Sequence, residues 1–206
     1  LIVSDSGKMN ESKRMAEEII RLIEKSVCDH EPILVAIDGR CASGKTTVAS
    51  LVAAKLGCDV IHMDDFFLQM NQRTPARLSE PGGNVDYERV GAEVLQPAKH
   101  GLPVVYRKFD CSRMDFGDEV TLIPKKYLLV EGAYSCHPKL RDYFDLHIFM
   151  TIDADTQMVR IRERNGNERA QMFRDRWIPL EETYIRECRV RECCAISLQA
   201  DTACDV

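Results

Sequence analysis

The chain has 206 residues, of which 45% are hydrophobic, and this length and composition fit one globular domain with a substantial core. Its 28 lysines and arginines against 33 acidic residues leave a net charge of −5, which argues against broad nucleic-acid binding. No apolar run is long enough to span a bilayer and no signal-peptide core opens the sequence, so we expect a cytoplasmic protein without a membrane partner.

The cysteines form no disulfide framework. There are nine, an odd number, and in a reducing compartment they are expected to be free thiols. Cys188, Cys193 and Cys194 are close enough in sequence to suggest a metal or redox cluster. No Cys-x-x-Cys pair supports that cluster and no histidine follows His147, so the sequence favours free thiols there as well.

The first elements in chain order alternate between helix and strand. Apolar side chains at helical spacing predict an amphipathic helix over residues 10–26. The continuous apolar run at 33–37 predicts a buried parallel strand, and 46–57 predict the helix that follows it. A second strand is expected at 59–63, and then a long polar loop at 68–85.

The later elements continue this alternation. Residues 86–97 predict a helix that Pro97 and Gly101 close. We expect a β-hairpin next, with strands at 104–106 and 119–122 joined by a loop over residues 107–118. Two buried strands are expected at 127–130 and 146–151. Two helices, at 153–165 and 168–193, are expected to be separated at Gly166. A final strand within 195–206 stays open.

This order predicts an α/β fold with a doubly wound, mostly parallel sheet and helices on both faces. We expect a single domain over residues 1–206, with an N-terminal helical segment at 1–32 and a core at 33–193. In such a fold, ligands bind at the carboxyl ends of the strands.

A phosphate-binding loop lies between the first strand and its helix. GRCASGKT at residues 39–46 fits the pattern Gly, four residues, Gly-Lys-Ser/Thr, whose backbone N–H groups and helix N-terminus bind phosphate. Gly39 and Gly44 are expected to avoid Cβ atoms that would obstruct the loop. Lys45 is expected to reach the β- and γ-phosphates of ATP and the Thr46 hydroxyl to ligate Mg²⁺. Further contacts with ATP are expected from Gly39, Ala42, Ser43, Gly44 and Thr47.

Two acidic residues follow the predicted strands at the same sheet edge. Asp64 comes just after the second strand and Glu131 just after the strand at 127–130. Phosphoryl transfer needs a metal ion and a carboxylate near the attacking hydroxyl. We expect Asp64, in preference to Asp65, to orient that hydroxyl and accept its proton, and Asp64 and Glu131 to join Thr46 around Mg²⁺. The alternative is that Asp64 and Asp65 only cap the next turn.

Arginines are dense after the strand at 146–151, at positions 160, 162, 164, 169, 174 and 176. One interpretation is a pair of solvated helices with ion pairs between successive turns. The other is a mobile lid over residues 160–177, in which Arg164 stabilises the transferring phosphoryl group and Arg160 contacts the nucleotide. Closure of such a lid would exclude water from the reaction.

An ordered set of motifs extends these signals: IDGRCASGKTT, HMDDFF, NVDYERV, PVVYRKFDCSRM, LLVEGAY and TIDADTQMVRIRER. From about Ile33 to Arg191 the chain resembles the uridine kinase group of P-loop kinases, with relatives such as phosphoribulokinase and nicotinamide riboside kinase. The resemblance implies an ATP- and Mg²⁺-dependent kinase whose substrate is a nucleoside or another small molecule that contains ribose. It implies the following roles: catalytic base for Asp64, ribose contact for Asp86, nucleoside pocket for Tyr106, substrate contacts for Arg113 and Glu131, and lid residues for Arg160 and Arg164.

The chain also departs from the group's pattern. Cys111 stands where uridine-cytidine kinases usually carry a histidine that reads the pyrimidine, and Asp86 is followed by Tyr-Glu-Arg in place of His-Pro-Asp. A thiol is a poor hydrogen-bond partner compared with imidazole. Two alternatives therefore stay open: a kinase for another hydroxyl metabolite, such as a vitamin precursor or sugar phosphate, and a nucleotide-dependent regulatory switch. The Asn-Lys-x-Asp guanine motif of GTPase switches is absent. The sequence also leaves open the donor, ATP or GTP, and whether the chain forms a homo-oligomer.

Overall fold

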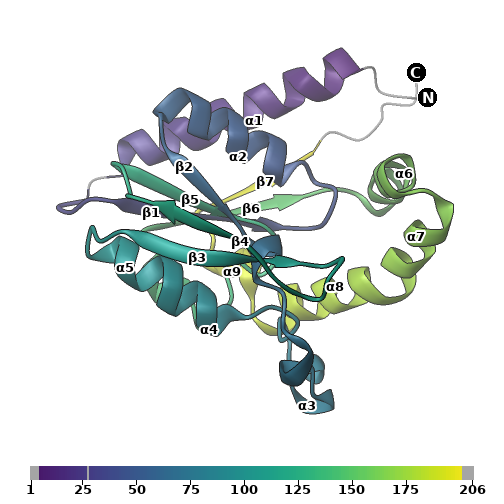
Figure 1. Ribbon diagram of the computed structural model, residues 1–206. Coiled ribbons are helices and arrows are strands. Elements are labelled where there is room, and N and C mark those ends of the chain that lie inside the picture. Colours follow the sequence, from purple (N-terminus) through teal and green to yellow (C-terminus); the bar gives the residue numbers. More distant parts are fainter. Residues whose placement is uncertain (1–4, 27, 201–206) are drawn as a thin grey trace.

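The computed structural model describes residues 5–26 and 28–200, and a five-stranded parallel sheet forms its centre (Figure 1). The strand order is β2-β5-β1-β6-β7, which places β1 in the middle. All neighbouring pairs run parallel, which confirms the predicted α/β fold. The strands are β1 (Ile33–Gly39), β2 (Asp59–His62), β5 (Tyr127–Glu131), β6 (Leu146–Thr151) and β7 (Ile196–Gln199).

Helices cover both faces of this sheet, as predicted. On one face lie α1 (Asp5–Lys25) and α2 (Lys45–Leu56). On the other lie α4 (Tyr87–Arg89), the π-helical turn η3 (Val90–Leu95), α5 (Gln96–Lys99), α8 (Ile178–Glu187) and α9 (Val190–Cys193). Successive β1 side chains alternate between the faces: Leu34 and Ala36 pack in one core cluster, Val35 and Ile37 in the other. Both faces of β1 are therefore buried, which explains its continuous apolar sequence.

The predicted hairpin is present, but its strands are longer than expected. β3 (Val104–Asp110) pairs antiparallel with β4 (Asp115–Leu122) in a separate two-stranded sheet. The tip is therefore confined to residues 111–114, and most of the predicted loop at 107–118 is strand. The inward side chain of Tyr106 stacks on Phe66 with ring centroids 4.9 Å apart, which fastens the hairpin to the segment after β2.

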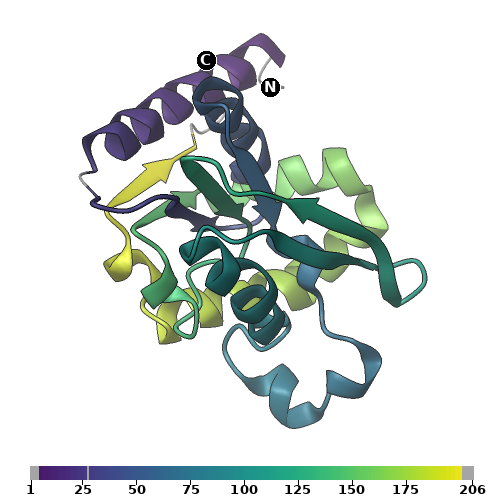
Figure 2. The ribbon, with the colours of Figure 1, turned by 60° about the vertical axis from the view of Figure 1, so that its left-hand side comes forward.

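The region between β2 and β3 differs from the one that the sequence predicts. After β2 comes the 3₁₀ turn η1 (Met63–Phe66), and the predicted loop at 68–85 holds two short pieces, η2 (Met70–Gln72) and α3 (Pro75–Ser79), which project from the body (Figure 2). The helix expected to close at Pro97 continues to Lys99, because α4, η3 and α5 follow one another without a break and Leu95 and Gln96 keep helical dihedral angles. Pro97 lies just after the π-helical turn η3, whose wider backbone accommodates a residue that has no N–H to donate.

The C-terminal third contains the region predicted as a lid. A 3₁₀ turn, η4 (Arg141–Tyr143), precedes β6, and α6 (Ala154–Asn165) follows it. Gly166, with φ of 78°, separates α6 from α7 (Asn167–Met172), which continues through the π-helical turn η5 (Phe173–Trp177) into α8.

The helix expected to run to residue 193 ends at Glu187, because Arg189 adopts a left-handed φ of 50° before α9 begins. The final strand left open by the sequence is β7, which pairs with β6 at one edge of the sheet. Over the described ranges, no helix combines the length and apolar character that crossing a membrane requires.

Candidate active site

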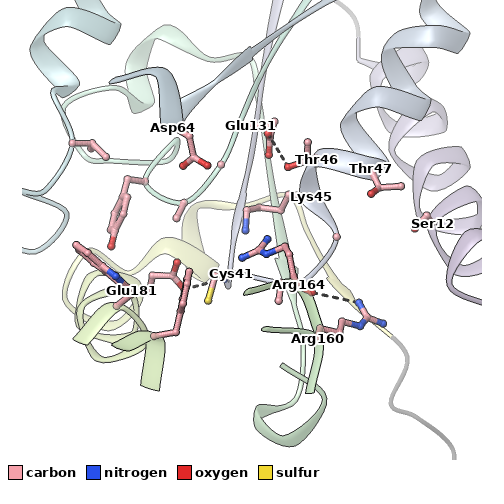
Figure 3. A pocket seen from close by; sticks show the side chains of 18 of the residues that line it. Ser12, Cys41, Lys45, Thr46, Thr47, Asp64, Glu131, Arg160, Arg164 and Glu181 are labelled. Atoms are coloured by element: carbon pink, nitrogen blue, oxygen red, sulfur yellow. Dashed lines mark hydrogen bonds between the residues drawn. The ribbon is translucent and has the colours of Figure 1, made fainter. Parts of the chain in front are cut away.

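A cavity of about 820 Å³ opens at the carboxyl ends of the central strands (Figure 3). It is walled by the phosphate loop, the first turns of α1, the segments after β2 and β5, helices α6 and α8, and the π-helical turn η5. Nine residues predicted to contact nucleotide, metal or substrate line it together: Ala42, Gly44, Lys45, Thr46, Thr47, Asp64, Glu131, Arg160 and Arg164.

The phosphate loop has the geometry that its glycines suggest. Gly39, with φ of 139°, packs against β6 so tightly that a Cβ atom would lie 1.8 Å from the carbonyl oxygen of Met150. Gly44, with φ of 91°, precedes α2 in open space, so glycine is needed there for the backbone conformation and not for room. The Lys45 ammonium donates to the carbonyl oxygens of Gly39 and Arg40 at 2.9 and 2.8 Å.

Gly39 and Ser43, both predicted as nucleotide contacts, do not line the cavity. The Ser43 side chain is fully buried, and its hydroxyl has no hydrogen-bond partner within residues 5–26 and 28–200. The Ser43 backbone N–H donates to the carbonyl oxygen of Arg40 at 3.2 Å, so its contact with phosphate stays a prediction.

Carboxylates gather beside Thr46, as the strand order predicts. Buried Glu131 accepts hydrogen bonds from the Thr46 hydroxyl at 3.0 Å and from Nδ1 of His62 at 2.6 Å. The bond with Glu131 raises the pKa of His62. Burial, and then the nearby charge of Glu131, raise the pKa of Asp64. Hard oxygen donors whose charges repel one another suit Mg²⁺, so Thr46, Asp64 and Glu131 fit the ion that the loop implies.

Asp64 and Asp65 have different surroundings. Asp64 lines the cavity. Asp65 accepts a hydrogen bond from the Tyr106 hydroxyl at 3.1 Å and lies 3.6 Å from the Lys108 ammonium. This arrangement favours Asp64 as the residue available to a substrate.

Helix α8 binds the back of the phosphate loop, a contact that sequence reasoning missed. Glu181 accepts a hydrogen bond from the backbone N–H of Cys41 at 2.9 Å, and Glu182 accepts one from Nη2 of Arg40 at 2.8 Å. The Tyr184 hydroxyl donates to buried Asp38 at 2.6 Å. A charged residue inside the apolar run of β1 was the one available signal, because a buried carboxylate requires partners.

Helix α1 forms the other end of the cavity, which the sequence also did not indicate. Glu11 lies 3.1 Å from the Arg160 guanidinium in a largely buried pair, and the ammonium of Lys8 lies 2.9 Å from Glu163 of α6. Ser12 of α1 and Thr47 stand at this end, across the loop from Asp64 and Glu181 (Figure 3).

The lid arginines divide between the two interpretations. Arg164 lines the cavity and donates to Asn165 at 2.9 Å. Arg174 pairs with its neighbour Asp175 on the surface. The other arginines of this stretch, Arg162, Arg169 and Arg176, are exposed.

Three residues expected to bind the acceptor lie off the cavity. Asp86 is buried, where it caps α4 through the N–H of Arg89 at 3.1 Å and accepts from Gln72 at 2.8 Å. Tyr106 is held by Asp65, and Arg113 is exposed on the hairpin tip beside Cys111. Other residues line the cavity instead, among them Phe67, Asn84, Tyr134, Phe173 and Trp177.

Comparison with known proteins identifies the family. No protein-family model matches the chain. The uridine kinase of Shewanella piezotolerans is 31% identical over 155 residues, which cover 68% of this chain and 71% of that enzyme. The chain belongs to the uridine kinase family. The uridine kinase of Escherichia coli, another family member, is 28% identical over 158 residues, with 69% and 72% of the two chains covered.

Solved structures of other proteins share the fold of this chain. A protein described as a possible uridine kinase from Bacillus stearothermophilus superposes with a TM-score of 0.70 over 91% of this chain and 99% of its own, at 17% identity. The D-glycerate 3-kinase of Cryptococcus neoformans has a TM-score of 0.60 over 84% and 87%, at 15% identity. The chain is therefore a P-loop kinase that acts on a small metabolite.

Proposed function

We propose that this kinase transfers the γ-phosphoryl group of ATP, with Mg²⁺, to a hydroxyl of a nucleoside or another ribose-containing metabolite. The observation that carries the proposal is that Asp64 faces the same cavity as Lys45 and Thr46. A general base must stand close to the phosphate site for in-line transfer, and the shared cavity supports that role for Asp64.

Each residue has a distinct task in this proposal. Lys45 and the loop N–H groups bind the phosphates, and Asp64 takes the proton of the attacking hydroxyl. Thr46 and Glu131 would hold Mg²⁺, which when bound neutralises phosphate charge. Arg164 would add positive charge from the lid side, and Arg160, beside α1, would contact the nucleotide. The polar end formed by Ser12 and Thr47 would then receive the nucleoside of ATP, and the end near Asp64 the acceptor.

A kinase for a hydroxyl metabolite without ribose is the second candidate. It is favoured by the positions of Asp86, Tyr106 and Arg113, none of which lines the cavity. An acceptor bound by Phe67, Tyr134 and Trp177 would need an apolar or aromatic portion beside its hydroxyl, since these aromatic side chains line the cavity.

A substrate screen distinguishes these candidates. The purified protein is incubated with ATP and Mg²⁺ and with nucleosides, ribosides and sugars in turn, and products are identified by mass spectrometry. Phosphorylated nucleoside or riboside, absent with Lys45→Ala, is the expected result. Product only from compounds without ribose would favour the second candidate, and ATP hydrolysis without any phosphorylated product would favour a regulatory switch.

Base recognition is tested with the same assay. Cys111 lies on the hairpin tip, outside the cavity lining, where imidazole is expected in pyrimidine-specific relatives. We expect uridine to be a poor substrate and Cys111→His to raise its phosphorylation efficiency relative to the best compound of the screen. Efficient use of uridine by the unmodified protein would place pyrimidine recognition elsewhere.

A cytoplasmic location belongs to the same proposal, since the described cysteines are free thiols.

A further inference from the structure

Three thiols meet behind the phosphate loop. The Sγ atom of Cys136, in the turn after β5, lies 4.0 Å from that of Cys194, which in turn lies 4.0 Å from that of Cys193 at the end of α9. All three sulfurs lie within 4.8 Å of one another. The fold thus adds Cys136 to the pair that is adjacent in sequence, whereas the Cys188 thiol donates to the carbonyl oxygen of Pro81.

The spacing of these sulfurs suits a soft metal ion. Ligands arranged tetrahedrally at about 2.3 Å from Zn²⁺ lie roughly 3.8 Å from one another, close to the separations seen here. Cys136 is fully buried, while Cys193 and Cys194 are half-buried, so an ion can reach the site from their side. Three thiolates leave a fourth position for water or another small ligand, as in zinc sites that are not closed by four protein ligands.

The segments that carry the three sulfurs are fixed by hydrogen bonds of their own. The thiols of Cys193 and Cys194 both donate to the carbonyl oxygen of Val190, at 3.0 and 3.1 Å. Arg141 donates to the backbone carbonyl oxygens of Cys136 and Cys188, so it joins the turn after β5 to the segment before α9. The residues that carry the sulfurs are therefore held in place by contacts other than a metal.

We infer that Cys136, Cys193 and Cys194 form a binding site for one thiophilic divalent cation such as Zn²⁺. Each thiol that binds the ion releases its proton to solvent, so affinity is expected to increase with pH. The site borders the catalytic loop, because the backbone N–H of Cys136 donates to Asp38 at 2.8 Å and Asp38 directly precedes Gly39. A bound ion would tie α9 to the turn that supports the loop and would stabilise the folded chain.

The test uses Co²⁺ as a spectroscopic probe and Zn²⁺ for stability. The reduced, metal-free full chain is titrated anaerobically with Co²⁺, and a sulfur-to-metal charge-transfer band saturating at one equivalent is expected. Cys193→Ser and Cys194→Ser should abolish the band while circular dichroism stays unchanged. Zn²⁺ should raise the thermal unfolding midpoint of the unmodified protein but not of these variants. Cys136→Ser is secondary, because its buried position makes a folding defect harder to separate from lost binding.

Two matched variants control for other thiols. Cys111→Ser removes an exposed cysteine on the hairpin tip, and Cys28→Ser disrupts a second group, Cys28, His30 and Asp145, whose ligand atoms also lie within 4.8 Å of one another. Both variants should keep the band. The inference would be overturned if the unmodified protein gave no band, if only Cys28→Ser removed it, or if it persisted in Cys193→Ser and Cys194→Ser. A disulfide between these cysteines under the reducing conditions of the titration would also overturn it.

Discussion

Asp64 and Asp65 are neighbours in sequence, yet only Asp64 lines the cavity, while Asp65 binds the Tyr106 hydroxyl. We expect Asp64→Asn to lower kcat by roughly 10²–10⁴-fold, the range for loss of a positioned general base, with little change in ATP affinity. Asp65→Asn is the matched control and should retain most activity. Steady-state kinetics and ATP titration measure both quantities, and a larger loss in Asp65→Asn would move the catalytic role by one residue.

The same environment sets a pH dependence. Burial and Glu131 raise the pKa of Asp64 above its usual value of 3.8, and only the ionised form accepts a proton. The acidic limb of kcat/KM is therefore expected above pH 3.8 and should move toward lower pH in Glu131→Gln, because the like charge is removed. Measured profiles of the two proteins check this shift.

His62 reports on Glu131 independently of activity. Its pKa is raised above 6.5 by the hydrogen bond with Glu131, so the protonated imidazole is favoured in the folded state. The stabilisation from this pair is complete below pH 6.5 and is lost as pH rises through the folded pKa. Titration followed by NMR should show a His62 pKa above 6.5 that falls in Glu131→Gln. An unchanged pKa in that variant would mean that the two side chains do not pair in solution.

Single residues were foreseeable from sequence where function follows a short local pattern. Lys45 and Thr46 follow the phosphate loop after β1, Asp64 follows β2, and Glu131 ends β5. The carboxyl ends of parallel strands meet at one edge, so the proximity of these residues followed from the strand order. The expected roles of Asp86 and Arg113 depend instead on how a capped helix and a hairpin tip sit relative to the cavity. That arrangement is set by long-range packing, which no local pattern contains.

Among the elements, α8 makes the contact with the greatest structural consequence. The Tyr184 hydroxyl is one of the donors to the Asp38 carboxylate, which is buried and has a pKa raised by that burial. Tyr184→Phe is expected to lower the free energy of unfolding by about 1–3 kcal/mol, because a buried carboxylate loses a partner. Urea denaturation measures the change.

Tyr127→Phe provides the comparison for this prediction. Tyr127 is also buried but lies at the start of β5, paired with Ile33 at the far end of β1 from Asp38. Its substitution should change the free energy of unfolding much less. Equal losses in the two variants would show that the effect comes from any buried tyrosine hydroxyl and not from Asp38.

Element types were predictable where periodicity is strong, as in β1, β5 and β6, whose apolar runs reflect burial on both faces. Boundaries were less so. Pro97 looked like a terminator because proline disrupts helix interiors, yet the helix runs past it beside the π-helical turn η3. Arg189 ends a helix through a left-handed conformation that glycine usually signals, so its sequence carried no sign of the break.

At the scale of the whole molecule, the N-terminal helix α1 contacts α6, the helix at which the lid region begins. It packs along α2 and reaches the cavity through Lys8, Met9, Glu11 and Ser12. If this end receives the nucleoside of ATP, Met9→Ala removes the apolar side chain among the otherwise polar residues that α1 contributes to the lining. The lost contact is worth roughly 1 kcal/mol, or about a fivefold increase in KM for ATP. KM for the acceptor should stay unchanged.

Asn10→Ala is the control for this wall, since Asn10 is the exposed neighbour outside the cavity lining. Its kinetic constants should match those of the unmodified protein. If Met9→Ala raised KM for the acceptor and not KM for ATP, the acceptor would bind at the α1 end of the cavity and the nucleoside of ATP at the other.

The contact of Glu181 in α8 with the phosphate loop also predicts that a proton is taken up from solvent when nucleotide binds. Burial raises its pKa, whereas Lys45 and the Cys41 N–H oppose that rise. Arriving phosphates would compete for both groups and add negative charge, so Glu181 should take up a proton as nucleotide binds. The calorimetric heat of ATP binding should then depend on the ionisation enthalpy of the buffer, and Glu181→Gln should reduce that dependence to the contribution of ATP itself. Buffer dependence that is identical in the two proteins would mean that Glu181 keeps its charge when the loop is occupied.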